Sequence, residues 1–374
     1  MQFLKLSSGI AIVVLVAATF AGLTTLPVVA QSTTNTMQFR YDAAHSGNYS
    51  PVAGSVGNGK LLWNFTSASL LWSSAAVANG LVYVGSRDDN VYALNATTGA
   101  KVWNYTTGSV VYSSPAVANG VVYVGSFDHK IYALNATTGA KLWNYTTGDL
   151  VKSSPAVANG LVYVGSDDNN LYALNASTGA KVWNYTTAFS VYSSPAVVNG
   201  VVYVGSEDNN TYALNASTGA KVWSYTTGNI VYSSPAVANG VVYVGSEDNN
   251  TYALNASTGA KVWKYTTGGG VESSPAVANG VVYVGSEDNN IYALNATTGA
   301  KVWKYTTGGG VESSPAVANG VVYVGSDDGN FYAFSTVSST AASSSGFLGL
   351  PGFEAVYAVA GMLAASYLLA RRKR

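Results

Sequence analysis

Hydrophobic and polar positions alternate in short runs along most of the chain, and turn residues separate the runs. Between residues 111 and 147 the runs VYSSPAVA, VVYVGS, IYALN and KVWNYTT show the two-residue period of strands with one buried face. Asn119-Gly120 joins the first two runs, and Asn-Gly is suited to a tight type I′ hairpin turn. Each such stretch predicts four antiparallel strands.

This pattern returns every forty residues. Each unit carries Trp at its third position, and the units begin at Leu61, Lys101, Lys141, Lys181, Lys221, Lys261 and Lys301. A period of about forty residues with four short strands is typical of a β-propeller blade. We therefore predict an all-β fold, a seven-bladed β-propeller of four-stranded antiparallel blades over residues 61–335.

The order of the runs also predicts how the ring closes. A Trp-bearing run at 61–66 precedes all the others, and the last unit ends at Phe334 without one. We expect the N-terminal strand 61–66 to complete the last blade, because closure removes an exposed strand edge. The proline of Ser-Ser-Pro-Ala has no N–H, so this run is expected to be the innermost strand, with its free edge facing the channel.

The two ends of the chain have the composition of targeting segments. Residues 1–30 are typical of a secretory signal peptide, with Lys5 before an apolar run, and an uncleaved anchor is the alternative. Residues 31–60 form a lead-in, and residues 336–350 form a Ser/Thr-rich stalk. Residues 351–374 contain a short apolar segment, barely long enough to span a bilayer, and a basic end.

The triplet Pro351-Gly352-Phe353, followed by an apolar helix and a basic end, resembles the PGF-type C-terminal sorting signal of archaeal surface proteins. The resemblance implies that an archaeosortase-like sorting protease removes the tail and that the body is attached to a membrane lipid. An ordinary single-pass anchor is the alternative. Both place the body on the extracellular face of the cell membrane.

The run from Ala93 to Trp103, ALNATTGAKVW, resembles the tryptophan-docking repeat of quinoprotein (PQQ-like) propellers. The resemblance recurs six times, and two positions depart from it: Asn95 stands for the motif's aspartate and Ala100 for its lysine. The enzymes of the family use pyrroloquinoline quinone and have eight blades, a vicinal disulfide and a calcium site. This chain has no cysteine, so we expect the non-catalytic branch and no cofactor.

Composition narrows the possible chemistry. Without cysteine there is no disulfide, thiolate metal site or cysteine nucleophile. The presence of only two histidines argues against a metal centre built from several histidines. The formal net charge is zero, but the basic residues at the two ends leave a mildly acidic body. This balance argues against nucleic acid as a partner. The chain is expected to act as a monomer.

Asn-x-Ser/Thr sequons are dense. Besides Asn48, Asn209 and Asn249, the candidates for N-glycosylation are Asn64, Asn95, Asn104, Asn135, Asn144, Asn175, Asn184, Asn215, Asn255 and Asn295. Turn chemistry is the alternative explanation for the set at Asn95 and its equivalents. It does not apply to Asn104, Asn144 and Asn184, which are predicted on the outer strand, so we expect several sequons to be modified in an exported protein.

Each unit also has an acidic turn after Val-Gly-Ser, with an aspartate at 88, 128, 168, 208, 248, 288 and 328. Calcium binding is conceivable because oxygen ligands gather there. Each turn is isolated on its own blade, however, and an Asx turn accounts for all seven. We favour the turn and predict no metal site.

The units differ from one another in two places, the loop before Ser-Ser and the turn after Val-Gly-Ser. In a four-stranded meander both connections lie at the same end of the blade, so one face of the ring is individual and the other uniform. The residue before Ser-Ser is expected to line the channel mouth, and around the ring it reads Trp72, Tyr112, Lys152, Tyr192, Tyr232, Glu272 and Glu312. Such a mixture is typical of a recognition surface, and drift in tolerant loops is the alternative.

These features predict an exported, surface-anchored and N-glycosylated propeller that binds a surface protein, a peptide or a glycan without catalysis. A purely structural envelope component is the first alternative. A PQQ-dependent oxidoreductase is the second.

Overall fold

The computed structural model describes Asp42 and residues 61–336, and within them the secondary structure consists of strands. The expected signal peptide, the stalk beyond Thr336 and the sorting signal lie outside these residues, as does the lead-in apart from Asp42. Within the described part, no helix is long and apolar enough to cross a membrane.

Seven antiparallel sheets follow one another along the chain, each with its strands in sequence order. We call them blades 1 to 7. The innermost strands are β1 (Ala76–Ala78), β5 (Ala116–Ala118), β9 (Ala156–Ala158), β13 (Ala196–Val198), β17 (Ala236–Ala238), β21 (Ala276–Ala278) and β25 (Ala316–Ala318). The second strands are β2 (Leu81–Gly85), β6 (Val121–Ser126), β10 (Leu161–Gly165), β14 (Val201–Gly205), β18 (Val241–Ser246), β22 (Val281–Ser286) and β26 (Val321–Gly325).

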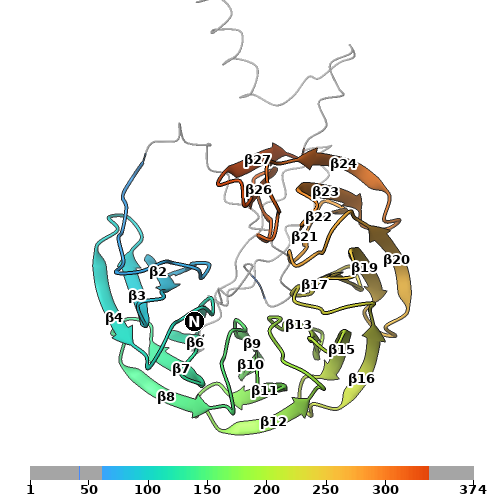
Figure 1. Cartoon of the computed structure of the whole chain (residues 1–374). Coiled ribbons are helices and arrows are strands. Elements are labelled where there is room, and N and C mark those ends of the chain that lie inside the picture. The colour runs from blue at the N-terminus through green and yellow to red at the C-terminus, as the bar shows by residue number, and fades with distance from the viewer. Residues whose placement is uncertain (1–41, 43–60, 337–374) are drawn as a thin grey trace, which may run out of the picture. The chain divides into compact units, whose positions relative to one another are not determined.

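The third strands are β3 (Asn90–Asn95), β7 (Lys130–Asn135), β11 (Asn170–Asn175), β15 (Asn210–Asn215), β19 (Asn250–Asn255), β23 (Asn290–Asn295) and β27 (Phe331–Ser335). The outer strands are β4 (Lys101–Thr106), β8 (Lys141–Thr146), β12 (Lys181–Thr186), β16 (Lys221–Thr226), β20 (Lys261–Thr266) and β24 (Lys301–Thr306). Figure 1 shows the sheets around a common centre, with the innermost strands nearest to it. The all-β, seven-bladed prediction is confirmed.

Local chemistry explains the hairpins. Asn119 and Gly120 have φ of 50° and 76°, the left-handed values of a type I′ turn, and the other units repeat them. The prediction of an Asn-Gly hairpin in every unit is confirmed.

Tryptophan joins each outer strand to the next blade. Nε1 of Trp103 donates to the carbonyl of Ala136 at 2.9 Å, and the Trp103 ring contacts Tyr83 with centroids 5.9 Å apart. A Cβ on Gly139 would lie 2.7 Å from that ring, so only glycine allows the tryptophan to approach. The interfaces between consecutive blades from blade 1 to blade 6 therefore repeat one docking contact.

The Ser-Ser-Pro segment differs from the prediction, because only three residues of each innermost run form a strand, Ala-Val-Val in blade 4 and Ala-Val-Ala in the others. The serines bond to the neighbouring blade instead. The N–H of Ser114 donates to Oγ of Ser154 at 3.0 Å, and the same bond links Ser154 to Ser194 at 2.9 Å and continues from blade to blade. These bonds form a serine collar at the channel and account for the invariance of the Ser-Ser pair, whereas the proline is replaced by Ala75 in blade 1.

The predicted closure is wrong in this structure. Residues 61–66 form no strand, and blade 7 has three strands. The segment is held by its side chains on blade 1, where Nε1 of Trp63 donates to the carbonyl of Ala96 at 3.0 Å and Phe65 contacts Tyr92. The side chains of Trp63 and Phe65 thus make the contacts that an outer strand makes with the next blade. Hydrogen bonds between this segment and β27 would require blades 7 and 1 to meet, and they have not formed here.

Exposure shows that these end blades do not pack as the others do. Val77 of blade 1 is 46% exposed, whereas its equivalent Val117 is 1% exposed. Phe331 of β27 is 73% exposed. The interface between blades 7 and 1 is thus unformed, and apolar surface remains open on both sides.

Candidate functional site

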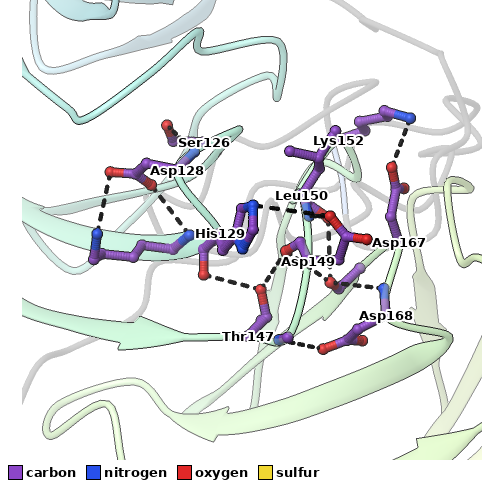
Figure 2. Close-up of polar contacts among 12 residues, drawn as sticks. Ser126, Asp128, His129, Thr147, Asp149, Leu150, Lys152, Asp167 and Asp168 are labelled. Atoms are coloured by element: carbon purple, nitrogen blue, oxygen red, sulfur yellow. Dashed lines mark hydrogen bonds and ion pairs between the residues drawn. The ribbon is translucent and has the colours of Figure 1, made fainter.

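The two variable connections lie at the same end of each blade and bond to each other. The N–H of Asp167, in the turn after β10, donates to the carbonyl of Leu150 in the loop before Ser153, at 2.9 Å. Figure 2 shows this region with Thr147, Asp149, Lys152 and Asp168. The other described blades contain the equivalent bond, for example from Glu247 to Ile230. The blade-specific residues are therefore gathered on one face.

The acidic turns have a structural role. Oδ2 of Asp168 accepts from the N–H of Gly148 at 2.6 Å and from the hydroxyl of Tyr172 at 2.7 Å, while Oδ1 accepts from the N–H of Asn170 at 3.0 Å. Both oxygens are thus used to join the third strand to the preceding loop. In blade 7 the Tyr332 hydroxyl and nearby N–H groups lower the pKa of Asp328 to about 2. These bonds support the turn interpretation over a calcium site in each turn.

One cavity of about 460 Å³ opens on the variable face above the serine collar. The structure brings all seven residues named from the sequence to its wall: Trp72, Tyr112, Lys152, Tyr192, Tyr232, Glu272 and Glu312. Collar serines and Asp327 complete the lining. Residues spaced forty apart in sequence thus meet at a single opening, which we call the mouth.

Aromatic rings form a continuous row over half of the mouth. Trp72 meets Tyr112 edge-on with centroids 5.5 Å apart, Tyr112 meets Tyr192 at 5.9 Å, and Tyr192 meets Tyr232 at 5.6 Å. Burial, the neighbouring Tyr112 hydroxyl and nearby carboxylates raise the pKa of Tyr192 far above its usual value, so this phenol stays neutral. We call Trp72, Tyr112, Tyr192 and Tyr232 the aromatic arc.

A second ring of residues lies beside the first, and the sequence analysis did not name its members as site residues. It consists of the first residue of each turn after Val-Gly-Ser: Arg87, Phe127, Asp167, Glu207, Glu247, Glu287 and Asp327. The variation of this turn between units was the signal that could have identified them.

In the first three blades the two rings form matched pairs. The Arg87 guanidinium lies 4.1 Å from the centroid of Trp72, and Phe127 stacks on Tyr112 at 6.0 Å. Nζ of Lys152 lies 2.6 Å from the Asp167 carboxylate, as drawn in Figure 2. Each of these blades thus pairs its own side chains at the mouth, although Oδ1 of Asp167 is enclosed and accepts no hydrogen bond from the described residues.

Blades 5 to 7 contribute carboxylates instead, which we call the acidic arc: Glu247, Glu272, Glu287, Glu312 and Asp327. Carboxylate oxygens of Glu247, Glu272 and Glu287 all lie within 4.8 Å of one another, a spacing that could hold a hard cation. A Cβ on Gly270 would lie 2.6 Å from Oε2 of Glu247 and 2.8 Å from Oε2 of Glu287. The Gly-Gly-Gly loop is therefore needed for these side chains to approach.

Crowding shifts the protonation of the acidic arc. Burial and the charges of Glu287 and Glu272 raise the pKa of Glu247 to about 7. Burial and neighbouring carboxylates also raise the pKa of Glu272 and of Glu312. Crowding therefore disfavours the charged form of each of these three carboxyl groups.

Replacing Glu247 with Gln is expected to stabilise the protein at alkaline pH. The pKa of this acid is higher in the folded state than in the unfolded state. Its contribution to stability is therefore fully present below pH 4.5 and is lost as the pH rises through about 7. We expect Glu247→Gln to raise the free energy of unfolding by about 1 kcal/mol at pH 8, because partial exposure reduces the linkage energy. Urea unfolding at pH 5 and pH 8 measures the difference.

The matched control is Asp89→Asn, because other units already carry Asn at this turn position, as at Asn169. Equal gains from both substitutions, or a Glu247→Gln gain that does not grow with pH, would contradict the crowding argument.

The described candidates from Asn64 to Asn295 do not line the cavity of the mouth: apart from Asn64, they lie on the outer strands or at the ends of the third strands. Oδ1 of Asn95 accepts from the N–H groups of Thr97 and Thr98, both at 2.9 Å, and thereby caps its turn. Nδ2 of Asn104 donates to Oδ1 of Asn90 at 2.9 Å. The described candidates, from Asn64 to Asn295, are all exposed or partly exposed.

Comparison with known proteins identifies the family of the chain. It matches the family described as "Outer membrane protein assembly factor BamB" over residues 52–190, 148–267 and 253–342, which together span most of its length. The chain belongs to this BamB family of PQQ-like propellers. The match confirms the prediction of a PQQ-like propeller repeat.

Solved structures agree with this BamB-like fold. BamB from Moraxella catarrhalis superposes with a TM-score of 0.64 at 22% identity, covering 72% of this chain and 87% of that one. The computationally designed protein Ika8 superposes with a TM-score of 0.65 at 17% identity, covering 70% of this chain and 83% of the other. At such identities the likeness concerns the fold alone. A search of curated proteins found no match.

The C-terminal end carries a second match. Residues 350–373 match the PGF-CTERM motif, which includes Pro351, Gly352 and Phe353. The archaeal C-terminal sorting signal is thus present, and it indicates that this BamB-family chain is exported and anchored at the cell surface by its C-terminal end.

Proposed function

We propose that the protein is a non-catalytic binding and scaffold module, and that it recognises its partner at the mouth. The observation that carries this proposal is the convergence of seven blade-specific residues on one cavity, while the opposite turns repeat from blade to blade. A rigid ring with one individual face is suited to recognition. The family is described as an assembly factor, which favours a protein or peptide over a glycan as partner.

Changes in the aromatic arc test the proposal. The full-length chain is applied to an array of peptides and glycans, together with Trp72→Ala, Tyr112→Ala and Tyr192→Ala. We expect each substitution to lower the affinity for the bound ligand by about tenfold or more, because aromatic side chains at the centre of an interface contribute much of its binding energy.

Val182→Ala is the matched control, since Val182 is 49% exposed on an outer strand away from the mouth. Binding that survives all three aromatic substitutions would place the binding surface elsewhere. A folded chain that binds nothing on the array would favour the alternative of a purely structural envelope component.

We further propose that several sequons carry N-glycans and that a sorting protease removes the tail. The exposure of the sequon asparagines supports the first point, and the C-terminal motif supports the second. Intact-mass and glycopeptide mass spectrometry of the native protein measures both. Unmodified sequons, or a chain that still ends in Arg374, would contradict the respective point.

A further inference from the structure

We infer that the partner presents basic side chains, and that the mouth binds a lysine- or arginine-bearing polypeptide segment. This inference rests on the proposed function and specifies its ligand. It follows from the contrast between the two halves of the mouth: the side chains of blades 1 to 3 pair with one another, whereas the carboxylates of the acidic arc have no cation from the described residues beside them.

The negative charge of the acidic arc has no counterpart in the described part of the protein. The ion pairs found there join His129 to Asp149, Lys130 to Asp128 and Lys152 to Asp167, all in blades 2 and 3. None involves Glu247, Glu272, Glu287 or Glu312. Oε1 of Glu247 is fully enclosed and accepts no hydrogen bond from the described residues. An enclosed carboxylate oxygen without a donor is costly. A positive group bound at Glu272, which lines the cavity and has a carboxylate oxygen within 4.8 Å of one of Glu247, would offset the charge crowded there.

The aromatic arc already binds cations of the chain itself. The Arg87 guanidinium lies over Trp72, and Nζ of Lys152 lies 5.5 Å from the centroid of Tyr192. The row continues to Tyr232, where burial and the charges of Glu207, Glu272 and Glu247 raise the pKa of the phenol. A cation entering here meets a ring face and carboxylates together, the combination that favours ammonium and guanidinium groups.

The shape of the site favours a polypeptide over a single ion or a neutral sugar. Carboxylates extend over three blades, from Glu247 to Asp327, so more than one positive group can be bound. A hard metal ion would use one oxygen cluster and leave the aromatic arc without a role. A neutral glycan would leave the carboxylates uncompensated, and an acidic ligand would be repelled.

The chain offers substitutions that the fold has already accepted. Glu272 and Glu312 occupy the position of Tyr112, Tyr192 and Tyr232 in other blades. The double variant Glu272→Tyr/Glu312→Tyr therefore removes charge from the mouth without a residue foreign to the repeat. Asp89→Asn is the matched control, because it removes one negative charge away from the cavity wall.

The test uses fluorescence anisotropy on the full-length chain at 0.15 M salt. One labelled peptide alternates Gly with Lys and Arg, and its partner carries acetyl-lysine and citrulline at the same positions. We expect the basic peptide to bind, the neutral peptide to bind at least tenfold more weakly, and the double variant to lose at least tenfold in affinity for the basic peptide. Asp89→Asn should stay within twofold of the parent, and circular dichroism confirms that each variant is folded.

Other outcomes separate this inference from the proposed function. Equal binding of both peptides, or array binding of a neutral glycan that Trp72→Ala abolishes, overturns the inference and leaves the proposed function standing. Calorimetric binding of calcium that the double variant loses, without binding of the basic peptide, makes the acidic arc a metal site and overturns the inference. A folded chain that binds neither peptides nor array ligands overturns both.

Discussion

Gly165→Ala is expected to destabilise the propeller by about 3 kcal/mol or more, or to prevent folding, because it overpacks a blade-to-blade interface. A Cβ at this end of β10 would lie 2.2 Å from the carbonyl oxygen of Val191 and 2.5 Å from its Cγ1. Backbone of the next blade cannot retreat from that contact without breaking the repeat packing. Thermal and urea unfolding followed by far-UV circular dichroism measure the loss.

Two other glycines provide matched controls. Gly160 has φ of +75° and open space around it, so Gly160→Ala carries only backbone strain of about 1–2 kcal/mol. Gly325 holds the position of Gly165 in blade 7, but its nearest neighbour, Ser313 Oγ, would be 3.5 Å from a new Cβ. Gly325→Ala should therefore be tolerated.

The Gly325 variant also tests ring closure. If Gly325→Ala is as costly as Gly165→Ala, blade 7 packs against blade 1 in solution, and the open interface described here is wrong. If Gly165→Ala itself is tolerated, the close packing of consecutive blades is wrong.

The blades were predictable because every determinant is local. Alternating side chains, Asn119-Gly120 and Trp103 act within one unit or between neighbours, so a forty-residue period carries the complete information. The gathering of Trp72, Tyr112 and their equivalents at one mouth follows from the same period. Each stands directly before the Ser-Ser pair, so each occupies the equivalent place in its own blade.

What the sequence did not reveal depends on contacts between side chains of different loops. The Arg87–Trp72 contact and the crowding of Glu247 with Glu287 follow from how two connections meet in space. Ring closure depends on the approach of two ends more than 250 residues apart, since β27 ends at Ser335 and the outer run begins at Leu61. No local pattern encodes that approach.

Trp183→Ala is expected to cost about 3–5 kcal/mol, the range for removing a buried large aromatic side chain. Trp183 is 8% exposed, and its ring packs on Tyr163 with centroids 5.8 Å apart. Its Nε1 donates to the carbonyl of Ala216 at 2.9 Å, which ties β12 to the next blade. The substitution opens a cavity between two blades and removes this bond. Urea unfolding followed by far-UV circular dichroism avoids relying on the fluorescence of the tryptophan that is lost.

Two variants separate packing from hydrogen bonding in this contact. Trp183→Phe keeps much of the ring and should lose little more than the single hydrogen bond, about 1 kcal/mol, since the Tyr163 hydroxyl still donates to the same carbonyl. Trp303→Ala should cost less than Trp183→Ala, because Trp303 docks on three-stranded blade 7 and is only partly buried. Equal losses at Trp183 and Trp303 would show that blade 7 is packed as completely as the others, because docking energy follows the burial that the next blade provides.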